Sequence, residues 1–209
     1  RYGWDIDPAR IFPVPDVVRG VYLALSFLTK PESPTIIPAP AYMPFWELTA
    51  ATGRETMVID AYGGLDLNDI EDCFKRGAGS LILCNPYNPL GYTFSREFLI
   101  ELADLTARYD ARIISDEIHG PLVYDGTHIP AASVSDTAAQ VCVTVTATSK
   151  AWNIAGLKCA QMIFTNDEDV ARWNAVPWML RDGVSILGLV AAQACYEAPT
   201  SFLDDQVAQ

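Results

Sequence analysis

A strand-like run leads into a lysine in the stretch Val141-Cys142-Val143-Thr144-Val145-Thr146-Ala147-Thr148-Ser149-Lys150-Ala151-Trp152-Asn153-Ile154-Ala155-Gly156-Leu157. The β-branched residues before Ala147 favour a strand, and the small residues after Lys150 favour a turn. A lysine at such a junction is expected to be partly desolvated, which lowers the pKa of its amine and frees the amine to attack an aldehyde. Most lysines are solvated surface residues instead, so the rest of the chain has to decide between the two interpretations.

Short apolar runs alternate with segments of helical periodicity along the chain. The apolar runs predict strands near residues 35–38, 56–60, 80–84, 111–115, 141–146 and 159–164. This alternation is typical of a mostly parallel sheet with helices on both faces, so the predicted fold class is α/β, a three-layer α/β/α sandwich. No internal repeat and no linker rich in Gly, Ser or Pro divides the sequence, which favours one domain over residues 1–209.

Two of the connecting segments carry helix signals. One helix is expected from an apolar face that consists of Phe98, Leu102, Leu105 and Tyr109. Ser95 is the candidate N-cap of this helix. A second, shorter helix is expected after Asp66, with Gly77 at its C-terminal end.

Polar residues stand just after three of the predicted strands. Asn88 lies within Asn85-Pro86-Tyr87-Asn88-Pro89-Leu90-Gly91, Asp116 lies within Ser115-Asp116-Glu117-Ile118-His119, and Lys150 follows the strand quoted above. In open α/β sheets, ligands bind at the carboxyl ends of the strands. We therefore expect Asn88, Asp116 and Lys150 to meet in one pocket.

The composition limits the partners of the chain. Its 26 acidic and 14 basic side chains give a formal charge of -12, which argues against nucleic acid or an anionic membrane as a partner. The longest apolar tract, residues 184–195, is too short to span a bilayer. Five cysteines form no Cys-x-x-Cys pair, and Cys84, Cys142 and Cys159 fall within apolar runs. These features favour reduced thiols, a cytoplasmic location and no metal site.

Four motifs occur in the order in which a known family has them. They are Pro38-Ala39-Pro40-Ala41-Tyr42-Met43-Pro44-Phe45 and the segments 85–91, 115–119 and 149–157. With them the chain resembles the fold-type I pyridoxal 5'-phosphate (PLP) enzymes, most closely the MalY/PatB-type cystathionine β-lyases within the aminotransferase class I/II superfamily. The resemblance begins and stops inside a typical family member. We therefore expect residues 1–209 to be the PLP-binding large domain, without the N-terminal arm and the small C-terminal domain.

The resemblance implies roles for four residues. Lys150 would form an imine with the cofactor's aldehyde and carry protons at the substrate's α-carbon, while Asp116 would keep the cofactor's ring nitrogen protonated. Tyr42 would stack on the ring, and Asn88 would hydrogen-bond the ring oxygen. Lys150, Asp116 and Tyr42 are the catalytic candidates. The residues alone also allow a turn-capping Asp116, a turn-forming Asn88 and a core aromatic at Tyr42.

The two histidines receive different predictions. His119 lies three residues after Asp116, where many aminotransferases have a tyrosine, and this histidine favours the β-lyase branch. It is a candidate cofactor contact, although a packed or solvent-facing histidine is an equally simple interpretation. His128 has no motif around it and is expected on the surface.

The phosphate contacts depart from the better-known superfamily pattern. A lysine stands eight residues after Lys150, where an arginine is common, and Ala147 stands where many relatives have a serine. A helix is expected to start near Asp16 and to present its first amides to the phosphate. The candidate phosphate contacts are Lys158, Thr148, Ser149 and the backbone amides of Val17 and Val18.

The leading hypothesis is a PLP-dependent carbon-sulfur β-lyase that cleaves cystathionine or a related cysteine S-conjugate to a thiol, pyruvate and ammonia. An aminotransferase is the first alternative, because it shares the early chemical steps. A non-catalytic regulatory protein that retains the fold is the second. The expected partners are a small amino-acid substrate and, in the full-length protein, a second copy of the chain.

Overall fold

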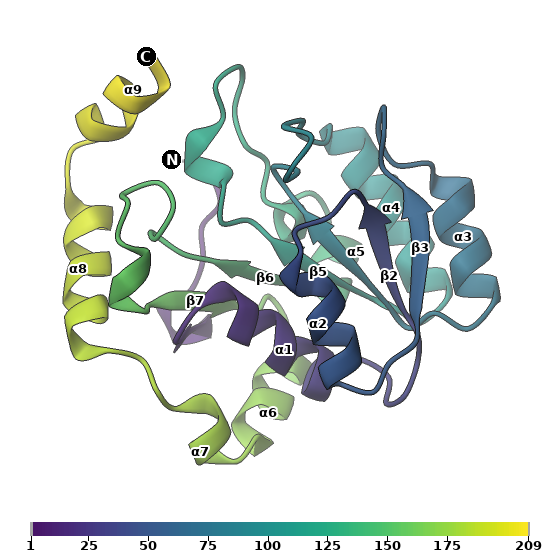
Figure 1. Cartoon of the computed structure of the whole chain (residues 1–209). Coiled ribbons are helices and arrows are strands. Elements are labelled where there is room, and N and C mark those ends of the chain that lie inside the picture. The colour runs from purple at the N-terminus through teal and green to yellow at the C-terminus, as the bar shows by residue number, and fades with distance from the viewer. Residues whose placement is uncertain (1, 209) are drawn as a thin grey trace.

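The computed structural model describes residues 2–208, and one seven-stranded sheet runs through this part of the chain (Figure 1). The strand order is β1-β7-β6-β5-β4-β2-β3, and only β7 runs against its neighbours. The strands are β1 (Ile11–Val14), β2 (Thr35–Ala39), β3 (Thr56–Asp60), β4 (Ser80–Cys84), β5 (Arg112–Asp116), β6 (Cys142–Thr146) and β7 (Ala160–Ile163). The predicted mostly parallel α/β fold is confirmed.

The six predicted strands all form, each within two residues of its expected bounds. Sequence reasoning missed β1, which pairs antiparallel with β7 at the edge of the sheet. This strand has only four residues and contains Pro13, a residue that lacks the N–H needed inside a sheet and is tolerated on edge strands.

Helices cover both faces of the sheet. They are α1 (Val17–Leu28), α2 (Pro44–Ala51), α3 (Leu67–Lys75), α4 (Arg96–Arg108), α5 (Asp136–Val141), α6 (Asp167–Ala175), α7 (Trp178–Arg181), α8 (Ile186–Glu197) and α9 (Ser201–Ala208), with short 3-10 helices at Pro8–Arg10, Gly120–Leu122, Ala131–Ser133 and Ala155–Leu157. In Figure 1, α1 and α2 lie in front of the sheet, and α3, α4 and α5 lie behind it. All residues of β4, and those of β5 after Arg112, are therefore buried.

The helix α1 packs tightly across β5, β6 and β7. Asp16 caps its first turn by accepting a hydrogen bond from the amide of Arg19 at 2.8 Å. Gly20 faces the sheet, where an added Cβ would lie 2.6 Å from Cγ1 of Val145. The glycine thus allows the helix to approach the sheet closely, and this approach fixes the N-terminus of α1 near the carboxyl end of β6.

The predicted helix signals are confirmed for α3 and α4. Ser95 accepts a hydrogen bond from the amide of Phe98, and Asp66 accepts one from the amide of Asn68. Gly77 follows α3 with φ +100°, a conformation that favours glycine. Tyr109 lies one residue past the end of α4 and stacks on Phe74 of α3, with ring centroids 5.7 Å apart.

Three further expectations concern cysteines, metals and membranes. All five cysteines are free, and Cys84, Cys142 and Cys159 are buried as predicted. Among residues 2–208, no cluster of three or more His, Cys, Asp or Glu side chains is suited to hold a metal ion. No helix in the same range has the length and apolar character that a membrane crossing requires.

Candidate active site

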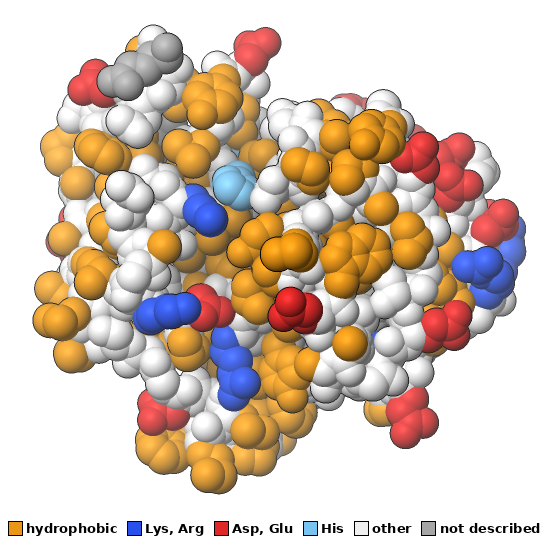
Figure 2. All heavy atoms as spheres, in the orientation of Figure 1, with side chains coloured by type: hydrophobic (Ala, Val, Ile, Leu, Met, Phe, Trp, Pro, Cys, Tyr) orange, Lys and Arg blue, Asp and Glu red, His pale blue; other side chains and the backbone are white. Residues whose placement is uncertain are grey.

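A pocket of about 180 Å³ opens where β4, β5 and β6 end and α1 begins, and we call it the Lys150 pocket. This is the edge at which an open α/β sheet binds its ligands. In Figure 2, basic, acidic and histidine side chains gather near the middle of the molecule, among apolar surface. Nine of the ten predicted site residues line the pocket: Val17, Val18, Tyr42, Asn88, Asp116, His119, Ser149, Lys150 and Lys158.

Asp116 lies at the end of β5 with only 4% of its surface exposed. Its Oδ1 accepts a hydrogen bond from the amide of Ile118 at 3.1 Å. Burial raises the pKa of the Asp116 carboxyl to about 7, the negative charge of Glu117 adds to this rise, and Lys150 opposes it. The pocket therefore contains a carboxylate that is costly to ionise without a nearby cation.

Lys150 occupies a turn that the backbone holds in place. The amide of Trp152 donates to the carbonyl of Thr148 at 3.0 Å, and the amide of Ile154 donates to the carbonyl of Ser149 at 3.0 Å. The Lys150 side chain lines the pocket but is exposed. The expected partial desolvation is therefore wrong for this structure, because the turn itself projects from the sheet and several of its residues are also exposed.

Asn88 and Tyr42 are both half-buried and line the pocket. The loop that carries Asn88 is tied to the loop that carries Tyr42, because the hydroxyl of Tyr87 donates to the carbonyl of Pro40 at 3.1 Å. Tyr42 also contacts Phe45 edge to face, with ring centroids 5.6 Å apart. Tyr42 therefore packs against the core and also lines the pocket, while its stacking on a cofactor ring stays a prediction.

His119 is half-buried and lines the pocket with Asp116 and Lys150. Burial lowers the pKa of its imidazole, and the positive charge of Lys150 lowers it further. His119 is accordingly neutral near pH 7, so one of its ring nitrogens donates a hydrogen bond and the other accepts one.

The end of the pocket near α1 carries donors that suit an anion. Val17 and Val18 form the first turn of α1, where backbone amides have no acceptor within the helix. Lys158 lies opposite with φ +56°, a left-handed conformation that is uncommon outside glycine. Its Nζ contacts Oδ2 of Asp16 at 3.0 Å, so the cap residue of α1 shares the positive charge of Lys158.

Thr148 is the predicted site residue that does not line the Lys150 pocket. It is 1% exposed, and its hydroxyl has no hydrogen-bond partner. Sequence reasoning did not select Cys84, which does line the pocket beneath Asn88 and accepts a hydrogen bond from the Asn88 amide. The apolar run that ends at Cys84 was the available signal, because residues at strand ends point alternately into such a pocket.

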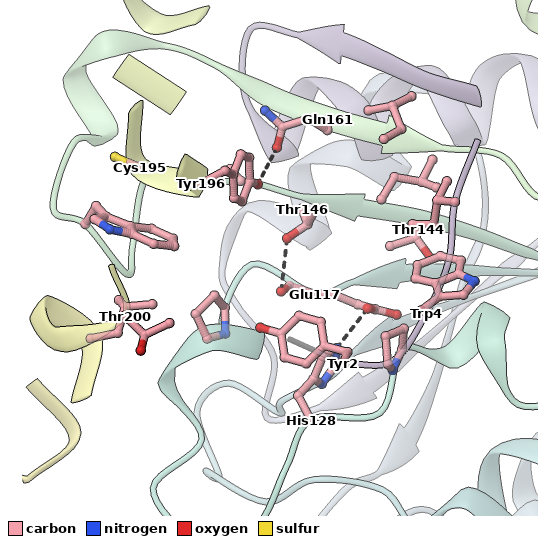
Figure 3. Close-up of a pocket in the computed structure, with 18 of the residues that line it drawn as sticks. Tyr2, Trp4, Glu117, His128, Thr144, Thr146, Gln161, Cys195, Tyr196 and Thr200 are labelled. Atoms are coloured by element: carbon pink, nitrogen blue, oxygen red, sulfur yellow. Dashed lines mark hydrogen bonds and ion pairs between the residues drawn. The ribbon is translucent and has the colours of Figure 1, made fainter. Parts of the chain in front are cut away.

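A larger cavity of about 420 Å³ lies on the opposite face of the sheet, and we call it the Glu117 cavity (Figure 3). Its walls include Tyr2, Trp4, Glu117, His128, Thr144 and Tyr196. Within the part of the chain that the structure describes, none of the predicted site residues and no Lys or Arg lines it. The larger of the two hollows is therefore apart from the predicted chemistry.

His128 lies in the wall of the Glu117 cavity and is 2% exposed, so the expected surface position is wrong. Its Nε2 lies 2.8 Å from Oε2 of Glu117, and its ring meets that of Tyr2 edge to face. The exposed loop before it, residues 124–127, misled the sequence interpretation, because the chain turns back into the core immediately afterwards.

Comparisons with known proteins agree with the geometry. The chain is 56% identical over 207 residues to a cystathionine beta-lyase of Corynebacterium glutamicum, an alignment that covers 99% of this chain and 56% of that protein. It is 33% identical to the cystathionine beta-lyase PatB of Bacillus subtilis, again covering 99% of this chain and 56% of the relative. The chain thus spans about half the length of the curated relatives that it matches.

Solved structures show the same fold. A protein of Corynebacterium diphtheriae assigned as a PLP-dependent beta-cystathionase superimposes with a TM-score of 0.98 at 57% identity, covering 100% of this chain and 55% of that one. Cystalysin of Treponema denticola, which contains pyridoxal 5'-phosphate, gives 0.91 at 28% identity over 100% of this chain and 55% of its own. A family model described as aminotransferase class I and II matches residues 2–202. The chain therefore belongs to the aminotransferase class I and II family.

Proposed function

We propose that the protein to which this chain belongs is a PLP-dependent carbon-sulfur β-lyase that cleaves cystathionine or related cysteine S-conjugates to a thiol, pyruvate and ammonia. The observation that carries the proposal is the meeting of the buried Asp116 carboxylate and the Lys150 amine in one pocket. The 56% identity to a cystathionine beta-lyase along the chain favours this outcome within the family.

The residues of the Lys150 pocket fit PLP. The Asp116 carboxylate accepts a hydrogen bond from the amide of Ile118, and a protonated ring nitrogen would supply the cation that a buried carboxylate needs. Lys150 offers a primary amine to an aldehyde on the same side of the sheet. The first-turn amides of α1, together with Ser149 and Lys158, offer donors to a phosphate.

Each of these side chains has a task in the proposed reaction. Bound PLP withdraws electrons from the substrate's α-carbon, which makes the α-proton acidic. Asp116 holds the proton on the ring nitrogen, Asn88 donates a hydrogen bond to the ring oxygen, and Tyr42 confines the ring by stacking. Thr148 receives no task here, because its hydroxyl is buried outside the pocket.

Lys150 moves the protons. Its amine takes the proton from the substrate's α-carbon, and the bond between the β-carbon and sulfur then breaks with both electrons leaving on sulfur. A proton neutralises the thiolate, and water converts the remaining three-carbon amine to pyruvate and ammonia. His119 is neutral and lies beside Lys150, so we place it next to the ring oxygen as a hydrogen-bonding side chain.

An aminotransferase is the second candidate, since the chain shares its family model with that class and is 28% identical to an alanine aminotransferase of Mycobacterium tuberculosis over 77% of this chain. The deciding experiment supplies the full-length protein, loaded with PLP, with cystathionine. The lyase proposal expects free thiol and pyruvate in equal amounts over many turnovers. Conversion of the bound cofactor to its amine form in one turnover, with no thiol, would contradict it.

A non-catalytic protein that keeps the fold is the third candidate, and cofactor binding separates it from the other two. We expect incubation with PLP to give a visible absorbance band that borohydride abolishes. Lys150→Ala is the control and should give no such band. Failure of the unaltered protein to bind PLP would leave only the non-catalytic candidate.

We also propose that the protein acts in the cytoplasm as a homodimer on an amino-acid substrate. Free buried cysteines are typical of a reducing compartment. Large apolar side chains on α7 and α8 are exposed by 62–76% and suit a protein partner: Trp178, Met179, Ile186, Leu187 and Val190. Sedimentation of the full-length protein checks the dimer, and a monomeric holoenzyme with full activity would contradict it.

A further inference from the structure

Strand β5 and the residue after it present two adjacent carboxylates to opposite faces of the sheet. Asp116 lines the Lys150 pocket, and Glu117 lines the Glu117 cavity (Figure 3). Successive residues of an extended chain point to opposite sides, which explains the separation. Each of the two residues is only 4% exposed. Two buried acids next to each other are costly, so the surroundings of the second one are informative.

Three donors face the carboxylate of Glu117. Its Oε1 accepts hydrogen bonds from the hydroxyl of Ser115 at 2.8 Å and from the amide of Ala131 at 2.9 Å. Its Oε2 lies 2.8 Å from Nε2 of His128. An ionised carboxylate is an acceptor only, so three donors are the arrangement that a negative charge requires.

The ring of His128 is fixed in place beside Glu117. Its Nε2 faces the carboxylate, and its Nδ1 is buried without a hydrogen-bond partner. Tyr2 contacts the ring at a centroid distance of 5.1 Å, and an added Cβ at Gly120 would lie 2.9 Å from it. The carboxylate of Glu117 is therefore held by a partner that has little room to move.

The backbone around Glu117 is held from both sides. The amide of Glu117 donates to the carbonyl of Val145 at 2.8 Å, and the Glu117 carbonyl accepts from the hydroxyl of Thr146 at 3.2 Å. On the other side, the amide of Asn85 donates to the carbonyl of Asp116 at 2.9 Å. The peptide that carries Asp116 is therefore fixed between β4 and β6.

Several other titratable groups surround Asp116, and they come from every neighbouring element. Lys150 is the cation whose charge lowers the pKa of Asp116, and Glu117 is the acid whose charge raises it. The remaining groups in the Lys150 pocket are Cys84, His119, Tyr42 and the ion pair of Asp16 with Lys158. On its own side, Glu117 faces His128 and the thiol of Cys142, whose pKa is raised by burial and by Glu117.

We propose that Glu117 is a positioning residue of the Lys150 pocket: its side chain ties the residue next to Asp116 to Ser115, Ala131 and His128, and its negative charge strengthens the hold of Asp116 on the proton of a cationic ring bound there. The part that concerns the ring rests on the proposed function. The part that concerns Asp116 itself does not, so the two can be tested separately.

The first test needs no cofactor. Carboxyl ¹³C NMR follows the titration of Asp116 in the chain itself and in Glu117→Gln, which keeps the shape of the side chain and removes its charge. We expect the Asp116 midpoint to fall by about half a pH unit or more in this variant. Glu101→Gln, a matched change at an exposed position on α4, should leave it unchanged. An unchanged midpoint in Glu117→Gln would overturn the proposal.

The unaltered chain provides a further check that does not depend on whether Glu117→Gln folds. Its Asp116 midpoint should lie well above the ordinary value of 3.8, because burial and the charge of Glu117 both raise the pKa of Asp116. A midpoint at the ordinary value would overturn the proposal.

The second test uses the full-length protein loaded with PLP. The alkaline limb of the pH profile of kcat/KM should move down by about half a pH unit or more in Glu117→Gln, because the ring loses its proton more easily. Ser115→Ala removes one donor and keeps the charge, so it should lower the melting temperature and leave the limb in place. If the alkaline limb of kcat/KM lies at the same pH in the unaltered protein and in both variants, Glu117 has only a structural role. If the unaltered protein shows no lyase activity, the proposed function fails while the NMR titration still decides the role of Glu117.

Discussion

The Lys150 pocket and the Glu117 cavity lie on opposite faces of the same strand ends, and they differ in how their acidic residues are satisfied. The cavity has about 420 Å³ and the pocket about 180 Å³. Among residues 2–208, Glu117 faces three donors, whereas Asp116 accepts one hydrogen bond, from the amide of Ile118. The reactive side is identified by the buried acid with the fewer donors, because that acid still needs a cation and lies in the same pocket as a lysine.

The largest effect should come from Lys150→Ala. This change removes the amine that binds the cofactor and moves the protons, so turnover with cystathionine should fall by about 10³-fold or more. The fold should remain, because the side chain is exposed and its turn is held by backbone hydrogen bonds. Steady-state assays measure the loss of turnover, and circular dichroism checks that the fold remains. Near-normal turnover in the variant would place the chemistry elsewhere.

Asp116→Asn should come next in size. The amide cannot hold the ring nitrogen's proton by a charged hydrogen bond, so kcat should fall by about 10²-fold or more. Cofactor affinity should fall less, since the other contacts remain. A kinetic comparison at saturating PLP separates the two effects, and a variant within about threefold of the unaltered rate would contradict the pairing.

The same substitution should have the opposite effect on the stability of the cofactor-free chain. The folded pKa of Asp116 is about 7 against an ordinary value of 3.8, so stability is full below about pH 4 and is lost as the pH rises through 7. Asp116→Asn removes this loss, which amounts to as much as about 4 kcal/mol at pH 8. Urea unfolding at pH 4 and pH 8 provides the check. Equal stability of the two proteins at pH 8 would argue against a costly buried charge.

Lys158→Ala should weaken PLP binding by roughly 3- to 10-fold, since an exposed ammonium that already pairs with Asp16 adds only modest attraction for a phosphate. Raising the salt concentration should shrink the difference. Titration of the visible band at two ionic strengths measures both. A larger loss that salt does not affect would mean that Lys158 shapes the pocket through its left-handed backbone.

The smallest effect is expected in the Glu117 cavity. The hydroxyl of Thr144 is buried there without a partner, and valine has nearly the same shape. Thr144→Val should raise stability by about 0.5–1 kcal/mol and leave turnover unchanged. Thermal melting and a lyase assay check this, and a marked loss of activity would show that the cavity contributes to the chemistry.

The sequence predicted most of the fold because its signals were local. The β-branched run before Lys150 and the caps at Ser95 and Asp66 depend on neighbouring residues only, and all of them formed as expected. The edge strand β1 was missed because its pairing with β7 joins residues about 150 positions apart. Short strands of this kind are specified by their partner more than by their own residues.

The position of the site and most of the residues that line it could also be predicted from the sequence. The alternation of strands and helices brought Asn88, Asp116 and Lys150 to one pocket, as strand-end position implied. The burial of His128 and the exposure of Lys150 were not predictable, because both depend on how a loop folds back on the sheet. The roles of Asn88, Asp116 and Lys150 in a reaction remain predictions until their variants are measured.

The most direct test of the central claim is to locate the cofactor. The full-length protein is loaded with PLP, reduced with borohydride, digested and analysed by mass spectrometry. The account predicts one modified peptide, with the reduced cofactor attached to Nζ of Lys150. Attachment at Lys158 or at another lysine, or no attachment, would contradict it.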